Sequence, residues 1–298
     1  MTSLVALPDG RDLAYEEYGD PDGTPLLSCH GGLSSRLDAA PAHDAAVALG
    51  IRLISPDRPG MGRSTFQPGR SLLDWPGDVA ALTDALGIDR FAIMGWSSGG
   101  PYAAACAARL GARVTTVGLL SSAVPLDLFG TTRGLSGDDR ILLFLVRWAP
   151  RVAAALMRAA IADASDTRLY QEAHRSLPAV DRAALDELGS PDAAVAFIKE
   201  SMRQGTRGVL QDYRIFGGPW GFDLEEVTAP VHLWEGSEDH TGPPEYREFL
   251  LAHLPVADLT VIPGEGHLSL LLHHAQPILA SLTDHDHSAE SMARWKVG

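Results

Sequence analysis

The ten residues 91–100 read Phe-Ala-Ile-Met-Gly-Trp-Ser-Ser-Gly-Gly, and an alanine-rich run from Pro101 to Leu110 follows them. A strand-type segment thus leads through a G-x-S-x-G pattern, Gly95 to Gly99, into a helical pattern. That order predicts a sharp strand-to-helix turn with the Ser97 hydroxyl exposed at its tip. Glycine at positions 95 and 99 permits the turn, because a Cβ atom at either place would collide there. The start of the helix also favours nearby negative charge.

The rest of the chain alternates between strand and helix patterns around this turn. Strands are expected over 3–7, 12–15, 25–29, 51–55, 114–120, 230–236 and 258–263, and helices over 38–49, 72–87 and 244–253, with a last helix ending near residue 282. Between 124 and 222 the pattern is helical throughout, over 138–149, 151–162, 166–176, 179–188, 192–204 and 207–215. The alternation predicts an α/β fold with a mostly parallel eight-stranded sheet flanked by helices.

The long helical segment is the basis for dividing the chain into parts. We expect a core over 1–123 and 223–282, an all-helical cap over 124–222 and a flexible tail over 283–298. Because helices cover both faces of the sheet, an insertion between two strands must rest on its carboxyl edge, where open α/β sheets bind ligands. The insertion is therefore expected to cover the site.

Composition narrows the class of protein and its partners. The net charge is −14, with no basic stripe, which argues against nucleic acid and anionic lipid as partners. The chain has no apolar run long enough to span a membrane and does not begin with a signal-peptide pattern, so a cytoplasmic location is expected. Cys29 and Cys106 form no disulfide framework and are expected to be buried thiols.

A serine hydroxyl needs a base, and the base needs a carboxylate. His267 follows the last expected strand in a glycine-rich loop, at the sheet edge that also carries Ser97. Asp239 follows the preceding strand and is the expected acid, with Glu238 a close alternative and Glu235 a weaker one. The chain order serine, aspartate, histidine is that of the α/β-hydrolases.

Four motifs in this order resemble the α/β-hydrolase superfamily in its capped form, in the esterase and proline iminopeptidase-like branch. They are His30-Gly31-Gly32, the loop Asp57 to Ser64, the G-x-S-x-G turn, and Gly236-x-x-Asp239 followed by Gly266-His267. The resemblance implies an oxyanion hole made by the backbone N–H groups of Ser98 and Gly32, with Leu33 a less favoured alternative to Gly32. It also implies structural roles for His30 and the 57–64 loop.

A serine nucleophile implies acyl transfer, and the expected activity is hydrolysis of an ester, lactone or thioester of a small, largely apolar molecule. No metal or organic cofactor is expected, and the protein is expected to be a monomer or homodimer. The candidate substrate-binding residues are Leu33, Trp96, Phe144, Trp148 and Trp220. The alternatives are a non-catalytic ligand-binding protein and, on the same site, a cofactor-free perhydrolase, a lyase or an aminopeptidase-like amidase. Leu33-Ser34 and Ser98 depart from the iminopeptidase pattern and disfavour that last activity.

Overall fold

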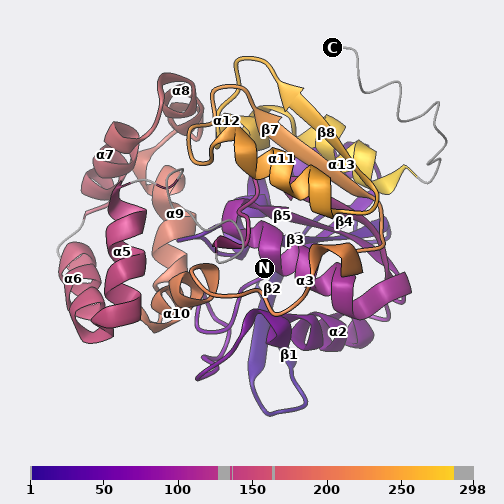
Figure 1. Ribbon diagram of the computed structural model, residues 1–298, viewed down its shortest axis with the longest axis horizontal. Helices are drawn as coiled ribbons and strands as arrows, with labels where there is room; N and C mark the ends of the chain where they lie inside the picture. Colours follow the sequence, from indigo (N-terminus) through magenta and orange to yellow (C-terminus); the bar gives the residue numbers. More distant parts are fainter. Residues whose placement is uncertain (1, 127–134, 136, 163–164, 285–298) are drawn as a thin grey trace.

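The computed structural model describes residues 2–126, 135, 137–162 and 165–284, and a single sheet forms its centre (Figure 1). Its strands are β1 (Ser3–Ala6), β2 (Asp12–Gly19), β3 (Thr24–Cys29), β4 (Ile51–Pro56), β5 (Phe91–Trp96), β6 (Val114–Leu120), β7 (Val231–Gly236) and β8 (Ala257–Ile262). The order across the sheet is β1-β2-β4-β3-β5-β6-β7-β8. Only the β1–β2 and β2–β4 pairs are antiparallel. The predicted mostly parallel eight-stranded sheet is confirmed.

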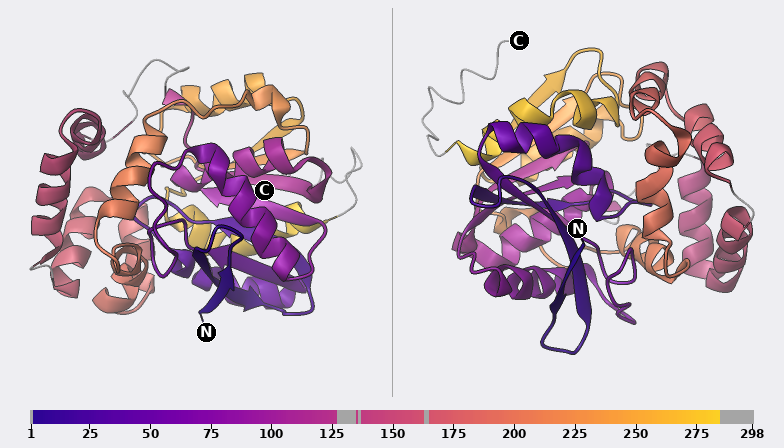
Figure 2. Two further views of the ribbon diagram at one scale, coloured as in Figure 1. Left: turned by 90° about the horizontal axis from the view of Figure 1, so that it is seen from below. Right: turned by 180° about the vertical axis from the view of Figure 1, so that it is seen from behind.

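Helices cover both faces of the sheet, as the two further views show (Figure 2). One face packs against α1 (His43–Ala48), α12 (Ser269–His273) and α13 (Ala275–Thr283), and the other against α2 (Trp75–Ala85), α3 (Gly100–Leu110) and α11 (Pro244–His253). Neighbouring residues along a strand point to opposite faces of the sheet. Leu26 packs on the face covered by α1, α12 and α13, and Leu27 packs on the other face; each side chain is at most 1% exposed. Burying such a side chain stabilises the fold by about 1.5–3 kcal/mol. Burial on both faces explains why the parallel strands read as continuous apolar runs.

Three expected helices differ from those in the structure. The segment predicted over 38–49 is a 3-10 helix, η1 (Arg36–Ala42), followed by the short α1, and Pro41 lies inside the first part. Proline has no N–H to donate and its ring clashes with the carbonyl four residues earlier, so a regular α-helix does not run through Pro41, and α1 begins only at His43. The segment at 72–87 likewise begins with a 3-10 turn, η2 (Leu72–Asp74), and the final helix is divided into α12 and α13 at His274.

Six helices are described between β6 and β7, over the segments predicted to be helical. They are α5 (Gly137–Trp148), α6 (Pro150–Ala162), α7 (Asp166–Ser176), α8 (Ala179–Glu187), α9 (Pro191–Ser201) and α10 (Arg207–Phe216), called the cap helices below. Figure 1 shows them gathered on one side of the sheet. The tail predicted from residue 283 lies, from residue 285 onward, outside the described part of the chain.

Asp212 attaches α10 to the core through buried charges. Its carboxylate accepts hydrogen bonds from Arg58 Nε at 2.7 Å and from Tyr102 Oη at 2.8 Å, and it also pairs with Arg70. The Arg58 guanidinium lies 4.5 Å from the centre of the Tyr102 ring. All four side chains are at most 8% exposed. Burial opposes ionisation of Asp212, but the two arginines dominate and lower its pKa to about 2.

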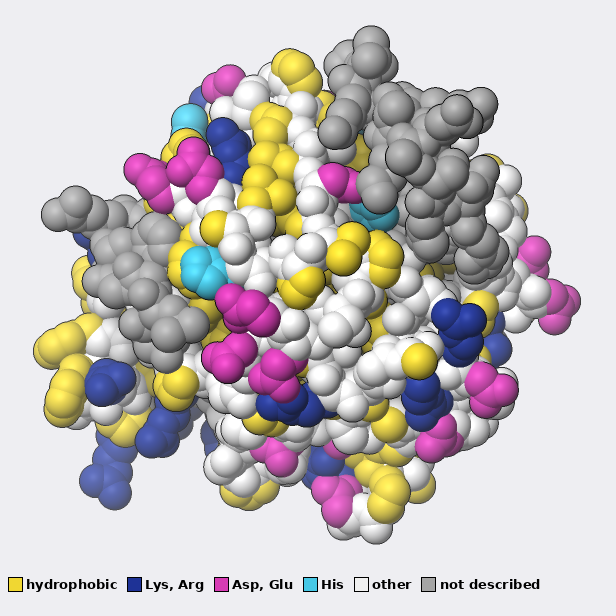
Figure 3. Space-filling model, turned by 45° about the vertical axis from the view of Figure 1, so that its right-hand side comes forward, with side chains coloured by type: hydrophobic (Ala, Val, Ile, Leu, Met, Phe, Trp, Pro, Cys, Tyr) yellow, Lys and Arg dark blue, Asp and Glu magenta, His cyan; other side chains and the backbone are white. Residues whose placement is uncertain are grey.

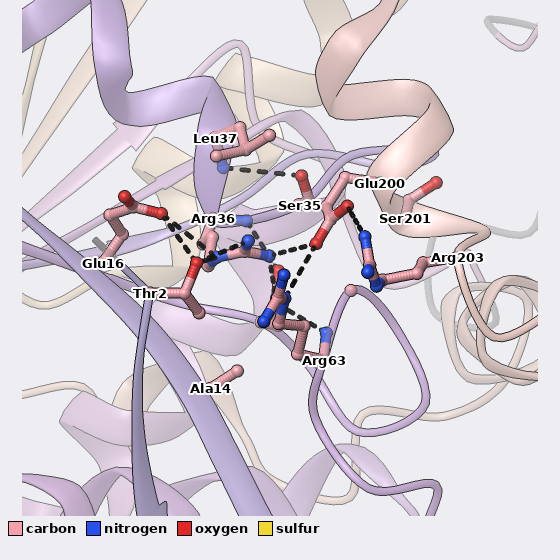
Figure 4. A network of polar contacts seen from close by, with 12 residues as sticks. Thr2, Ala14, Glu16, Ser35, Arg36, Leu37, Arg63, Glu200, Ser201 and Arg203 are labelled. Carbon is pink, nitrogen blue, oxygen red and sulfur yellow. Dashed lines mark hydrogen bonds and ion pairs between the residues drawn. The ribbon is translucent and has the colours of Figure 1, made fainter.

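Glu200 provides a second attachment, from α9 to Arg36 at the start of η1 (Figure 4). Arg36 Nη1 donates to Glu200 Oε1 at 2.8 Å and to Asp57 Oδ2 at 2.7 Å. Arg203 Nη1 donates to the other Glu200 oxygen at 3.2 Å. The 57–64 loop, expected to be scaffold, therefore holds a core arginine that in turn binds a cap helix.

The surface carries charges of both signs. On the face in Figure 3, acidic, basic and apolar side chains are interspersed, and the described side chains form no continuous basic stripe. Among the described residues, no helix is both long and apolar enough to cross a lipid bilayer.

Candidate active site

Ser97 lies at the turn where β5 ends and the helical segment leading to α3 begins. Its backbone is in the left-handed region, with φ of 56°. A Cβ atom on Gly95 would lie 2.3 Å from the carbonyl oxygen of Gly99, and one on Gly99 would lie 2.0 Å from that of Cys29. Glycine is thus required on both sides of the serine, as the sequence predicts. Such a strained conformation persists because the surrounding backbone over-determines it.

His267 lies in the loop after β8 and contacts Asp239, which follows β7. The distance from His267 Nδ1 to Asp239 Oδ2 is 2.8 Å. Thr241 Oγ1 donates to the other Asp239 oxygen at 2.6 Å and lies 2.8 Å from the same imidazole nitrogen. Because the Nδ1–H of His267 donates to Asp239 and Thr241, its Nε2 is left as the nitrogen that can accept a proton. Asp239 is thus the neighbour of the imidazole, whereas Glu238 is exposed and Glu235 pairs with Arg247 at 3.0 Å.

Burial and charge act in opposite directions on the pKa values of this pair. Burial disfavours the ionised Asp239, but the charge and hydrogen bond of His267 outweigh it and hold the pKa of that carboxyl well below its usual range. Burial likewise disfavours protonated His267, but the charge and hydrogen bond of Asp239 raise the pKa of the imidazole above its ordinary value. The arrangement stabilises an imidazolium next to a carboxylate, which is the charge state needed after a proton leaves serine.

Trp96 joins the serine turn to the histidine loop. Its indole Nε1 donates to the carbonyl oxygen of His267 at 3.1 Å, and the two ring centres lie 5.2 Å apart. A Cβ atom on Gly31 would lie 2.8 Å from the Trp96 ring, so the segment after β3 also packs against the indole. Trp96, predicted to bind substrate, thus lines the cavity and also packs against the segments on either side of it.

The segment predicted to supply an oxyanion donor lies against Ser98. A Cβ atom on Gly32 would lie 3.0 Å from Ser98 Oγ, and Leu33 has a left-handed backbone with φ of 47°. His30 supports this segment from inside the core: it is fully buried, and its Nε2 accepts the backbone N–H of Arg58 at 3.1 Å. Arg58 Nη2 in turn donates to the carbonyl oxygen of Gly31 at 2.7 Å. Burial, followed by the charge of Arg58, holds the pKa of His30 well below its usual value, which fits a structural role for His30.

A cavity of about 270 Å³ brings most of the predicted site residues together. Its lining includes Gly32, Leu33, Trp96, Ser97, Ser98, Trp220, Asp239 and His267. Phe144 and Trp148 are not among the described residues that line it; their side chains are 62% and 68% exposed. They lie on the outward side of α5, so the structure places them apart from the other candidate substrate-binding residues. No group of three or more His, Cys, Asp or Glu side chains in the described chain is arranged to hold a metal ion.

Two residues of this site carry no recognisable signal in the sequence. Thr241 bridges the acid and the histidine, and its backbone N–H also donates to the Asp239 carboxylate. Nothing in the sequence marks it except its place two residues after Asp239. Asp181, on α8, accepts the backbone N–H of His267 at 2.9 Å from 86 residues away in the chain. A contact of this kind depends on how the cap helices meet the core, which no local pattern records.

Comparisons with known proteins identify the family of this chain. A family model described as "alpha/beta hydrolase fold" matches residues 24–274. An "Uncharacterized hydrolase YcgS" of Bacillus subtilis (strain 168) is 34% identical over 264 residues, covering 87% of this chain and 89% of that protein. A "Bifunctional esterase/perhydrolase DCH" of Acinetobacter calcoaceticus is 32% identical over 122 residues, or 41% of this chain and 44% of that protein.

Among solved structures, a thermophilic esterase from Thermogutta terrifontis superposes with a TM-score of 0.69 over 99% of each chain, at 20% identity. At that identity the likeness concerns the fold alone. The family model and the Bacillus relative extend over most of the chain, and with the observed sheet they show the relationship. The chain belongs to the α/β-hydrolase fold family and is a hydrolase.

Proposed function

We propose that this protein is a serine hydrolase that cleaves an ester, lactone or thioester of a small, largely apolar substrate. The observation that carries the proposal is the 2.8 Å contact between His267 Nδ1 and Asp239 Oδ2 at a cavity whose wall also contains Ser97. Residues 124–222 are proposed as the cap over this cavity. A thermophilic esterase among the structural neighbours is consistent with ester hydrolysis.

The reaction follows from the protonation states at the site. His267 Nε2 takes the proton of Ser97 as its oxygen attacks the substrate carbonyl carbon, and Asp239 stabilises the resulting imidazolium. The backbone N–H groups of Ser98 and Gly32 bind the oxyanion, and each such donor contributes about 2.7–4 kcal/mol to transition-state stabilisation. The imidazolium then protonates the leaving group. Water, deprotonated by His267, releases the acyl group from Ser97 and restores the hydroxyl.

The cavity also indicates which substrates fit. Its apolar lining includes Leu33, Met61, Leu72, Trp96, Val209, Ile215, Phe216 and Trp220. Four carboxylates but no Lys or Arg occur among the described lining residues: Asp139, Asp212, Glu235 and Asp239. A neutral acyl group therefore fits better than an anionic one, because a buried negative charge would meet these carboxylates and find no Lys or Arg among the described lining residues.

The decisive test is turnover of short p-nitrophenyl esters by wild type and Ser97→Ala. We expect kcat/KM to fall by at least about 10³-fold in the variant. A fluorophosphonate adduct mapped by mass spectrometry should lie on Ser97. Equal turnover by the two proteins, or labelling at another residue, would overturn the proposal.

A second candidate activity is perhydrolysis on the same site, favoured by the similarity to a bifunctional esterase/perhydrolase. Hydrogen peroxide would then attack the acyl-enzyme in place of water, giving a peroxycarboxylic acid and free Ser97. Peracid formation that depends on peroxide and on Ser97 would demonstrate it, whereas ester hydrolysis without peracid would exclude it.

A further inference from the structure

Asp181 is a fully buried carboxylate on cap helix α8, and it accepts three hydrogen bonds from the loop that carries His267. Its Oδ2 accepts the backbone N–H of His267 at 2.9 Å. Its Oδ1 accepts those of Leu268 and Ser269, each also at 2.9 Å. Three successive amides thus converge on one side chain from the cap, and Figure 1 shows α8 beside α12, where this loop ends.

The loop and the carboxylate fit closely around each other. A Cβ atom on Gly266 would lie 2.5 Å from Asp181 Oδ1, so only glycine allows this approach. The backbone of His267 is also bound on its other side, because its carbonyl oxygen accepts the Trp96 indole N–H at 3.1 Å. The residue is therefore held between a cap helix and the turn that carries Ser97.

We propose that Asp181 is a positioning residue that fixes the His267 backbone, so that the imidazole reaches Ser97 only when the cap is seated on the core. This inference rests on the proposed hydrolase function, and it assigns Asp181, a residue of a cap helix, a role in that function. Small displacements matter here, since a misplacement of about 1 Å in a catalytic group costs about 10²-fold in rate.

Asp181 also contributes charge. Burial disfavours protonated His267, and the carboxylates that oppose this effect are Asp239 on the loop after β7, Asp181 on α8 and Asp139 on α5. Glu235 on β7 lines the same cavity and is paired with Arg247. Removing the Asp181 charge should therefore lower the pKa of His267, in addition to loosening its backbone.

The experiment compares Asp181→Asn with Asp186→Asn in the full chain. Asp186 lies on the same helix, is 54% exposed and bonds Tyr170, so its variant loses the same charge away from the loop. For Asp181→Asn we expect kcat to fall about 10- to 100-fold with KM changed less than about threefold. The acidic inflection of kcat/KM should move to lower pH. Asp186→Asn should match wild type in both respects.

A readout independent of turnover separates this inference from the proposed function. Nuclear magnetic resonance titration of the His267 imidazole should give a lower pKa in Asp181→Asn than in wild type, even if no ester is cleaved. Wild type that neither hydrolyses esters nor reacts with fluorophosphonate would remove the proposed function. Active wild type with an Asp181→Asn variant of unchanged kcat and His267 pKa would overturn the inference alone.

If Asp181→Asn does not fold, Asp181→Glu takes its place. This variant keeps the charge but displaces the carboxylate by one methylene group. We expect lower kcat with the inflection near its wild-type pH. A folded Asp181→Glu with wild-type kcat would overturn the proposal.

Discussion

The charge state of one imidazole sets the rate of the proposed reaction, because only neutral His267 can accept the Ser97 proton. Burial favours the neutral ring, but the charge and hydrogen bond of Asp239 raise the pKa of His267 above about 6.5. Below that pKa the ring is protonated and inactive, so kcat/KM for a p-nitrophenyl ester should rise with pH and level off above it. We expect the inflection above pH 6.5 in a profile from about pH 5 to about pH 9. A profile already level at about pH 6 would contradict the assignment.

Two adjacent carboxylates provide a matched test of the acid. Asp239→Asn leaves the shape of the side chain but can favour the wrong tautomer of His267, and we expect kcat/KM to fall by about 10⁴-fold. Glu238→Gln removes the same charge one residue earlier, on an exposed side chain, and should leave kcat/KM within about twofold of wild type. Steady-state hydrolysis of one ester by both variants decides the matter. The opposite ranking would make Glu238 the acid.

The serine turn tolerates little change in its sequence. Gly99→Ala would place a Cβ atom 2.0 Å from the carbonyl oxygen of Cys29 and 2.7 Å from that of His30. Both are backbone atoms that lead into the proposed oxyanion segment, so relief requires the turn and that segment to separate. We expect the free energy of unfolding to fall by more than about 2 kcal/mol, with a large loss of activity.

Gly77→Ala is the control for the same chemical change. Gly77 lies in α2, is exposed, and a Cβ atom there would have nothing within 4 Å. This variant should be more stable than wild type by about 0.4–1 kcal/mol, because alanine restricts the unfolded chain. Urea unfolding followed by circular dichroism measures both changes. A Gly99→Ala protein as stable as wild type would mean that the turn is more adaptable than these distances imply.

The sequence predicts helices and strands well where the hydrophobic pattern and the positions of glycine and proline agree. The strands buried on both faces and the serine turn follow from apolar runs and from glycine at 95 and 99. Prediction was poorer at helix starts, where 3-10 turns precede α1 and α2. There the expected segments are helical, but Pro41 interrupts the first one and a capping box from Ser71 to Asp74 spans the turn that precedes α2.

On the scale of the whole molecule, the sequence predicts which residues reach the carboxyl edge of the sheet but not how the cap helices meet it. Ser97, Asp239 and His267 each follow a strand, so parallel topology alone brings them to one edge. By contrast, Asp212 meets Arg58 from 154 residues away. Phe144 and Trp148, which the sequence predicts to bind substrate, face outward. An amphipathic pattern shows that a helix has an apolar side but not which neighbour covers it.

The attachment of α10 to the core gives the last prediction. Asp212 balances Arg58 and Arg70, and Asp212→Asn would leave two buried guanidinium groups without their carboxylate. Breaking a buried pair in this way costs about 3–5 kcal/mol, and we expect the free energy of unfolding to fall by that amount at pH 7. Because the folded-state pKa of Asp212 is about 2, below its unfolded value, this stabilisation is present above about pH 4 and is lost as the pH falls through about 2.

Asp166→Asn is the control, since Asp166 on α7 pairs with Lys199 on α9 at 2.5 Å while their side chains are 32% and 49% exposed. An exposed pair contributes about 0–1 kcal/mol, so its loss should hardly move the urea midpoint. If the cap is attached mainly through Asp212, limited proteolysis should cut Asp212→Asn within the cap helices before the core is lost. Equal midpoints for the two variants would mean that apolar packing of α10, rather than its buried carboxylate, holds the cap in place.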